Sequence, residues 1–286
     1  DDGYLPQCWT LAAAIAARTK QIRIGTAVSQ LPLHAAIETA EQVALVDIMS
    51  NGRVEPGFGV GDRIPEYEAF GSNFDRRYEI FADRIQELRA LWGEEPGPYQ
   101  QITPSPVQDP VPMWGGFRGP GGARTAGRLG LGLQWMDESL LAPYRAGLDE
   151  AGYDRSRERM AGSMAFLLAD DPERAWAQTR EHVEYRWNSY NRYRVENTAE
   201  PVPEPVDSNE WVASGRFVLG TVDAVVRAVE DRTQGLPVTD IMFWGGYPGM
   251  PDNLVDRHIE LAFSDLRTRL DDLRPATGPA RIADAT

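Results

Sequence analysis

Glycines and charged side chains gather where an apolar segment gives way to a polar loop. Residues 57–61 read Gly-Phe-Gly-Val-Gly and are followed directly by Asp62 and Arg63. Successive side chains of a strand point to opposite faces, so these glycines leave the strand end bare, and a flat ligand can approach the backbone there. A carboxylate with a raised pKa acts as a general acid or base. We therefore treat Asp62 and Arg63 as candidate catalytic residues; the alternative is a solvent-exposed pair without function.

A second glycine-rich segment begins at Gly115 and Gly116 and continues through Arg118 to Arg124. A helix is expected to begin within it, and the free N–H groups of a helix N-terminus bind anions. Arginine adds charge-assisted hydrogen bonds to phosphate. The segment lacks Gly-Lys-Ser/Thr and is therefore not a Walker loop. The alternatives are a flexible glycine loop here and a rival anion site at 245–247.

Small and polar residues also end an earlier apolar segment, at 26–30, and His34 follows it. Residues of this size suit the edge of a flat heteroaromatic ring, although an ordinary strand end has the same composition. His34 is a candidate substrate-facing residue. The three histidines are far apart in the sequence, and no spacing of ligand types indicates a metal site.

Helical and strand patterns alternate along the chain, which predicts parallel strands with right-handed crossovers. Pro56 removes a hydrogen-bond donor and predicts a bulge or an edge. The acidic, proline-rich residues 196–210 indicate an exposed loop or lid. We expect strands at 21–28, 53–60, 111–116, 131–136, 160–169 and 238–244, and helices at 8–20, 35–49, 76–92, 121–129, 138–151, 172–194, 222–234 and 252–272.

The composition excludes several classes of protein. A formal net charge of −14 disfavours nucleic-acid binding and attraction to anionic membrane surfaces. The sequence contains no apolar run of the ~20 residues that span a bilayer. A single cysteine, Cys8, permits no intrachain disulfide, which fits a reducing, cytoplasmic setting.

Five segments in order resemble the bacterial luciferase-like superfamily of flavin-dependent oxidoreductases: 11–26, 40–53, 57–71, 112–116 and 247–251. The resemblance implies a TIM (β/α)8 barrel in which the strand at 21–28 is the third. The first two strands are then missing from the sequence, and we expect an N-terminal segment or a partner chain to supply them. Residues 1–272 would form a single barrel domain, and 273–286 a loose tail.

The resemblance implies a monooxygenase that uses reduced FMN and O2 to oxygenate a small organic substrate. Reduced flavin would come from a separate reductase, and a homodimer is expected. Asp62, His34 and Arg63 would act on the substrate. The cofactor would contact Thr26, Ala27, Ser29, Gln30, Val60, Gly61, Gly115, Gly116, Arg118 and Arg124. The alternatives are an F420-dependent hydride-transfer enzyme and a catalytically silent flavin-binding relative.

Overall fold

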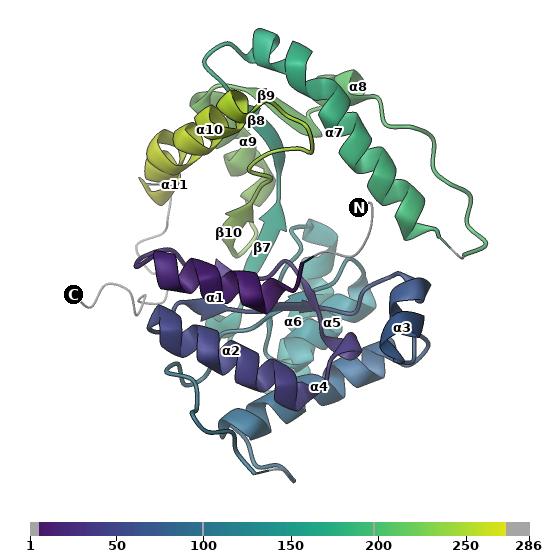
Figure 1. Ribbon diagram of the computed structural model, residues 1–286, viewed down its shortest axis with the longest axis vertical. Helices are drawn as coiled ribbons and strands as arrows, with labels where there is room; N and C mark the ends of the chain where they lie inside the picture. The colour runs from purple at the N-terminus through teal and green to yellow at the C-terminus, as the bar shows by residue number, and fades with distance from the viewer. Residues whose placement is uncertain (1–5, 99, 197, 273–286) are drawn as a thin grey trace. The chain divides into compact units, whose positions relative to one another are not determined.

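The computed structural model describes residues 6–98, 100–196 and 198–272 (Figure 1). The described residues up to Ala161 form one compact unit, here called the N-terminal unit, and those from Gly162 onward form the C-terminal unit. The prediction of a single domain over 1–272 stays a prediction, and the predicted tail at 273–286 lies outside the described residues. Within the described part of the chain, no helix is both long and apolar enough to cross a membrane.

Parallel strands form the centre of the N-terminal unit. One sheet has the order β2-β4-β5-β6, and Leu133 of β6 pairs onward with Met160 of β7 (Met160–Ser163). A separate short ladder joins β1 to β3, also in parallel. The strands are β1 (Ile24–Gly25), β2 (Ser29–Gln30), β3 (Val54–Glu55), β4 (Gly57–Gly59), β5 (Trp114–Gly116) and β6 (Gly132–Leu133).

Pro56 interrupts the strand predicted at 53–60, as its missing N–H group led us to expect. The ladder stops after Glu55 and resumes at Gly57 in a different pairing. The Thr26 hydroxyl spans the interruption, because it donates to the Gly57 carbonyl at 2.6 Å and accepts from the Gly57 N–H at 3.0 Å. The Pro56 carbonyl meanwhile accepts from the backbone N–H of Trp114 at 2.9 Å. These bonds keep the polar backbone satisfied where the ladder is broken.

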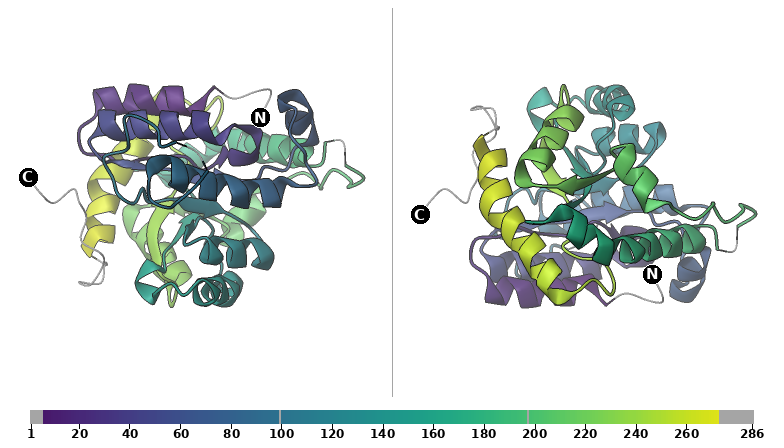
Figure 2. Two further views of the ribbon diagram at one scale, coloured as in Figure 1. Left: turned by 90° about the horizontal axis from the view of Figure 1, so that it is seen from below. Right: turned by 90° about the horizontal axis from the view of Figure 1, so that it is seen from above.

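Helices cover these strands, and α1 and α2 lie side by side in Figures 1 and 2. α2 ends where expected, because Asn51 adopts the left-handed conformation with φ 56°. α5 and α6 approach until their backbones touch: a Cβ at Gly127 would lie 2.1 Å from the Tyr144 carbonyl oxygen. The helices are α1 (Cys8–Arg18), α2 (Ala36–Ser50), α3 (Ile64–Phe70), α4 (Arg77–Trp92), α5 (Pro120–Arg128) and α6 (Leu141–Glu150).

Two buried charged residues brace the N-terminal unit. The Asp47 carboxylate accepts the backbone N–H groups of Val107 and Gln108 at 2.7 and 2.9 Å. The Arg53 guanidinium donates to backbone carbonyls at the end of α1 and just beyond it, within residues 16–22. The segment 40–53, which resembles the family, therefore has a structural role: Asp47 and Arg53 hydrogen-bond to the backbone of neighbouring loops and helices.

In the C-terminal unit, β8 (Ala165–Leu168) pairs in parallel with β9 (Phe217–Gly220). Met164, which separates β8 from β7, donates its N–H to the Met242 carbonyl of β10 (Val238–Met242) at 2.8 Å. The helices are α7 (Pro172–Arg194), α8 (Ser208–Ala213), α9 (Val222–Thr233), α10 (Asp252–Leu261) and α11 (Arg267–Asp272), with a π-helical turn at Ala262–Leu266.

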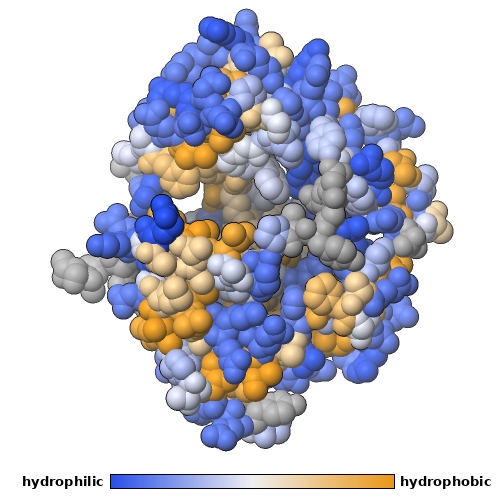
Figure 3. All heavy atoms as spheres, in the orientation of Figure 1, coloured by the Kyte–Doolittle hydropathy of each residue, from blue (hydrophilic) through white to orange (hydrophobic). Residues whose placement is uncertain are grey.

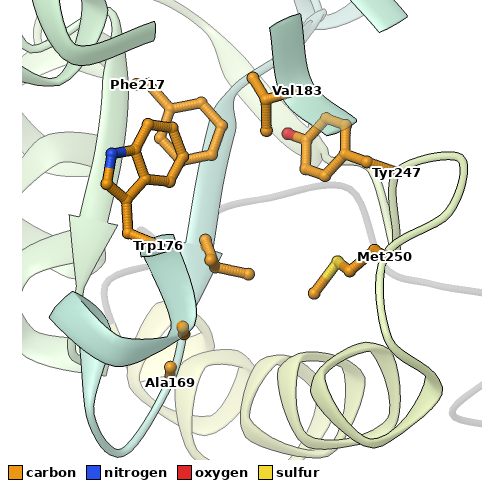
Figure 4. Close-up of a cluster of buried hydrophobic side chains, with 8 residues drawn as sticks. Ala169, Trp176, Val183, Phe217, Tyr247 and Met250 are labelled. Carbon is orange, nitrogen blue, oxygen red and sulfur yellow. The ribbon is translucent and has the colours of Figure 1, made fainter. Parts of the chain in front are cut away.

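One hydrophobic cluster forms the core beneath α7 (Figure 4). The Trp176 and Phe217 rings lie 4.9 Å apart between centroids. Tyr247 enters the cluster from the segment that follows β10. The members are Leu167, Ala169, Ala175, Trp176, Val183, Phe217, Tyr247 and Met250.

Candidate functional site

The register of the parallel strands brings several predicted site residues together. Gln30 pairs with Gly59, and Gly59 pairs with Gly116, so these residues form one row across β2, β4 and β5. The preceding row contains Ser29, Phe58 and Gly115. Val60 and Gly61 follow β4 directly. We call the residues Ser29, Gln30, 59–61, Gly115 and Gly116, at the carboxyl ends of these strands, the mouth.

Val28 lies in the predicted segment 26–30 but was not among its predicted cofactor contacts, and it covers two glycines of the mouth. A Cβ at Gly59 would lie 2.4 Å from one Val28 methyl group, and a Cβ at Gly116 would lie 2.5 Å from the other. Any larger residue at either position would displace this side chain. Val28 is 38% exposed and presents an apolar face beside the mouth. The peptide bond between Ala27 and Val28 is cis.

The other glycines of the 57–61 segment also make room for this chain's own side chains. A Cβ at Gly57 would lie 2.1 Å from the Thr26 carbonyl oxygen and 2.5 Å from the Gln134 amide oxygen. Gln134 follows β6 and donates from its amide nitrogen to that Thr26 carbonyl at 3.2 Å. The expectation of a bare strand end was therefore wrong: Val28 and Gln134 occupy the space that the glycines leave. A ligand at the mouth would meet Val28 rather than bare backbone.

Gln30 carries a polar group that the described residues leave unsatisfied. Its side-chain oxygen is buried and has no hydrogen-bond partner in the described part of the chain. The carboxamide lies against Gly61, whose φ of 72° suits glycine. A carboxamide offers both a donor and an acceptor, whichever way it is turned. The mouth therefore has a polar edge at Gln30 beside the apolar face of Val28.

The loop after β4 carries two of the three predicted catalytic residues, Asp62 and Arg63, and gives them different surroundings. Arg63 forms an ion pair with Glu66 at 2.9 Å, within the first turn of α3. Asp62 is exposed, and no contact of its carboxylate is found among the described residues. Nearby, the buried Tyr67 hydroxyl donates to the Val60 carbonyl, which is therefore already occupied. The Asp62 carboxylate is thus open to solvent, whereas Arg63 has an acidic partner.

His34 follows a 3-10 turn at Leu31–Leu33 and is half-buried. Its ring meets Phe70 edge-on, with 5.3 Å between centroids. Burial lowers the pKa of the imidazole below its ordinary value, and nearby Glu38 opposes the shift. Burial therefore favours the neutral form of His34, and a neutral imidazole can accept a proton.

The two arginines of the 115–124 segment have different surroundings. The Arg118 guanidinium lies over the Trp135 ring, 5.2 Å from its centroid, near the start of α5. Arg124 lies on the second turn of α5 and forms an exposed ion pair with Glu150 of α6. The helix start is open at Gly121, where a Cβ would meet nothing within 4 Å, and closed at Gly122, where a Cβ would lie 2.6 Å from the Phe117 side chain. Arg118 therefore lies beside the glycine-rich loop, whereas Arg124 is paired with Glu150. The rival anion segment, 245–247, belongs to the C-terminal unit.

A cavity of about 600 Å³ lies in the C-terminal unit, where β8 and β9 end. None of the predicted site residues lines it, and two of its acids are already paired: Asp170 with Arg257 at 2.7 Å, and Asp223 with Arg269 at 2.8 Å. In the described ranges, no group of three or more His, Cys, Asp or Glu side chains is placed to hold a metal ion. We therefore keep the mouth as the candidate site.

Comparisons with known proteins agree with this fold. Among curated relatives, the F420-dependent glucose-6-phosphate dehydrogenase of Kineococcus radiotolerans is 26% identical over 78% of this chain and 75% of its own length. The crystal structure of monooxygenase RslO1 from Streptomyces bottropensis matches with a TM-score of 0.79 at 23% identity, covering 94% of this chain and 84% of that one.

A further structure is the oxygenating constituent of 3,6-diketocamphane monooxygenase from Pseudomonas putida, solved in complex with FMN. It matches with a TM-score of 0.68 at 16% identity and covers 93% of this chain and 84% of that one. The family model described as luciferase-like monooxygenase matches residues 1–239. The chain therefore belongs to the luciferase-like monooxygenase family, as an oxidoreductase with the TIM-barrel fold of that family.

Proposed function

We propose that this protein is a flavin-dependent monooxygenase that uses reduced FMN and O2 to oxygenate a small organic substrate, and that the mouth of the N-terminal unit holds the flavin ring. The observation that carries the proposal is the position of Val28. Its two methyl groups rest on Gly59 and Gly116, and the residue is 38% exposed. A side chain held in this way offers a flat ring a fixed apolar surface.

The residues of the mouth fit a flavin in their polar groups as well. The edge of a flavin ring alternates N–H donors and carbonyl acceptors. The buried Gln30 oxygen lacks a donor among the described residues, and an N–H group of the ring would supply one. An unsatisfied buried acceptor costs free energy until it is paired. Ser29, Gly115 and Gly116 lie in the same two rows as Gln30 and would contact the ring through backbone and small side chains.

For the FMN phosphate we propose the start of α5, with Arg118 beside it. The first turn of a helix leaves backbone N–H groups unpaired, and these favour an anion. Open space at Gly121 and the nearby Arg118 guanidinium support this choice. Arg124 no longer belongs to the proposed set, because its charge is engaged by Glu150.

When bound, reduced FMN supplies the two electrons that let one oxygen atom of O2 enter the substrate while the other leaves as water. This chain's own residues would exclude bulk water and move protons. We assign the proton-accepting role to His34, because burial favours the neutral form of its imidazole. Asp62 stands as the second candidate, with an exposed carboxylate. Arg63 would hold the start of α3 through Glu66 rather than contact the substrate.

An F420-dependent hydride transfer is the second candidate function. The specific observation in its favour is the similarity, over 256 residues, to the F420-dependent glucose-6-phosphate dehydrogenase of Kineococcus radiotolerans. The features of the mouth suit a deazaflavin ring equally well, since its ring edge also carries N–H and carbonyl groups. The cofactor is therefore the point that an experiment must decide.

We further propose that a separate reductase supplies the reduced flavin and that the protein is a homodimer. α1 and α2 expose an apolar face, visible as orange surface in Figure 3. Exposed apolar patches of this kind mark interaction sites. The exposed residues on the two helices are Leu11, Ile15, Ile37, Leu45, Ile48 and Met49.

Titration of the purified protein with FMN and with F420, followed by oxygen uptake, tests these proposals. We expect micromolar binding of FMN, and O2 consumption with reduced FMN that rises when a substrate is added. Tight binding of F420 alone, with substrate-dependent F420 reduction and no O2 uptake, would favour the hydride-transfer function instead.

Sedimentation of the wild type beside Leu45→Glu tests the homodimer, because the variant should sediment as a monomer.

A further inference from the structure

α7 of the C-terminal unit carries an arginine, Arg186, that has no acidic partner among the residues that the structure describes. The Arg186 guanidinium lies 4.4 Å from the centroid of the Trp244 ring, 5.3 Å from that of Trp187 and 5.4 Å from that of Tyr190. In the described part of the chain, no carboxylate forms an ion pair with Arg186, and its Nη1 atom is buried without an acceptor. A cation surrounded by aromatic rings on several sides has lost much of its water and gained no anion in return.

Two more hydrogen-bond donors beside this arginine are also unsatisfied. The Tyr247 hydroxyl and the Trp187 indole nitrogen are buried and have no partner among the described residues. Tyr247 is only 4% exposed. Figure 4 shows its hydroxyl directed toward Val183, which lies one turn before Arg186 on α7. Trp187 packs against the same hydrophobic cluster that contains Tyr247.

The segment from Trp244 to Met250 crosses α7 over a single turn and so brings these groups together. At one point a Cβ on Gly249 would lie 2.8 Å from the His182 ring, and the φ of +84° at Gly249 suits glycine. One turn further along α7, Arg186 stacks on Trp244. Burial raises the pKa of the Tyr247 phenol, and the positive charge of Arg186 acts in the opposite direction. The contact of Arg186 with Trp244 and the direction of the Tyr247 hydroxyl toward Val183 place both groups along the same stretch of α7.

All three unsatisfied groups are hydrogen-bond donors. The indole N–H and the guanidinium can only donate, the guanidinium is also positively charged, and the phenol donates readily. The matching ligand is an anion with several acceptor oxygens. We propose that Arg186, Trp187 and Tyr247 form a binding site for an oxoanion, a carboxylate or phosphoryl group carried by an organic molecule whose flat or apolar body lies against Trp244. Trp244 is 42% exposed, so part of its ring is open to such a body.

This site goes beyond the proposed function. It lies wholly in the C-terminal unit, whereas the proposed flavin site lies in the N-terminal unit. Its test uses simple anions and no flavin, so the two proposals can fail separately.

The experiment is a titration with sodium benzoate and, separately, with inorganic phosphate, followed by tryptophan fluorescence at constant ionic strength with chloride as the balancing ion. Trp187 and Trp244 lie beside the guanidinium and report on its occupancy. We expect saturable binding in the wild type and at least tenfold weaker binding in Arg186→Gln. Arg192→Gln is the matched control, because Arg192 lies on the same helix and stacks on Tyr193 at 5.2 Å but is exposed. It should bind like the wild type.

Tyr247→Phe gives an independent test should Arg186→Gln fail to fold. The variant removes a hydroxyl that has no partner within the described residues, so its stability should equal or exceed that of the wild type. Its affinity for the anion should nevertheless fall about fivefold, which a purely structural role for Tyr247 would not produce.

Tighter binding of benzoate than of phosphate would support the site and identify an organic carboxylate as its ligand. Tighter binding of phosphate would support it and identify a phosphoryl group. The proposal is overturned if neither anion gives a saturable response beyond that of chloride. It is equally overturned if Arg186→Gln, or in its place Tyr247→Phe, binds benzoate and phosphate as tightly as Arg192→Gln.

Discussion

The mouth of the N-terminal unit and the α7 region of the C-terminal unit leave different kinds of polar group unsatisfied among the described residues: a buried acceptor, the Gln30 side-chain oxygen, at the mouth, and buried donors around α7. Near the mouth, the Thr26 hydroxyl and the Gln134 amide nitrogen donate hydrogen bonds to backbone carbonyls, and the Val28 side chain fills the space over two glycines. Around α7, the Nη1 atom of the half-buried Arg186 and the hydroxyl of the buried Tyr247 have no acceptor among the described residues. The first region is shaped for a flat, neutral ring, and the second has the charge for an anion.

The largest effect is expected at the tightest contact near the mouth. In Gly57→Ala the new Cβ would lie 2.1 Å from the Thr26 carbonyl oxygen, which is backbone and cannot turn aside. We expect the free energy of unfolding to fall by roughly 3 kcal/mol, at the upper end for overpacked sites. Urea denaturation measures this.

Gly121→Ala is the control for that measurement. A Cβ there meets nothing within 4 Å, and the residue lies in α5. Alanine favours a helix over glycine by about 1 kcal/mol, so this variant should be as stable as the wild type or more so. Equal losses in the free energy of unfolding of the two variants would show that the close contact at Gly57 is not what destabilises Gly57→Ala.

A pair of tyrosines tests the contrast in hydrogen bonding directly. The Tyr144 hydroxyl of the N-terminal unit is buried and donates to the Leu131 carbonyl at 2.8 Å, whereas the Tyr247 hydroxyl has no partner among the described residues. Tyr144→Phe should lower the free energy of unfolding by about 1–2 kcal/mol, because it leaves a buried acceptor unpaired. Tyr247→Phe should leave it unchanged or raise it. Similar losses from both substitutions would remove the contrast between the two regions.

The smallest effect concerns His258, a buried group of the C-terminal unit whose two ring nitrogens are both bonded. Nδ1 accepts from the Leu168 N–H at 3.0 Å, and Nε2 donates to the Trp244 carbonyl at 3.1 Å. Burial is the main cause that lowers the pKa of His258 below the value of 6.5 for a free imidazole. The unfolded chain therefore binds a proton at a higher pH than the folded chain does.

It follows that the free energy of unfolding falls as the pH drops below 6.5, and that this loss continues until the folded pKa is reached. Above pH 6.5 the contribution is constant. Denaturation between pH 5 and 8 should show a weaker pH dependence in His258→Asn than in the wild type. If the free energy of unfolding depends on pH with the same slope in both proteins, His258 is not the source of that dependence.

Local sequence patterns predicted many helices and their ends. The helix predicted at 35–49 is α2, Ala36–Ser50, and the one predicted at 76–92 is α4, Arg77–Trp92. These segments have regular helical spacing and clear stop residues. α8, Ser208–Ala213, was missed: it begins inside the predicted loop 196–210 and extends beyond it, and Asp207 caps it by accepting from the Asn209 N–H at 2.9 Å. The acidic, proline-rich composition hid that capping signal.

The site could be predicted only in part, for a physical reason. Parallel alternation implies that carboxyl ends of strands meet, and the register places Ser29 and Gln30 in the same rows as Gly115 and Gly116. Their role as cofactor contacts stays a prediction. The position of Val28 over two distant glycines depends on the path of the backbone after Thr26, which no spacing in the sequence encodes. The same holds for Arg186 and Tyr247, which lie far apart along the chain.

The most direct test of the central claim is an FMN titration, followed by flavin fluorescence, of the wild type, Val28→Asp and Val107→Asp. Val107 is an exposed valine of the same unit, 56% exposed against 38% for Val28, and lies outside the mouth. We predict micromolar dissociation constants for the wild type and Val107→Asp, and at least thirtyfold weaker binding for Val28→Asp. Equal affinity in the two variants, or no FMN binding by the wild type, would contradict the assignment of the mouth as the flavin site.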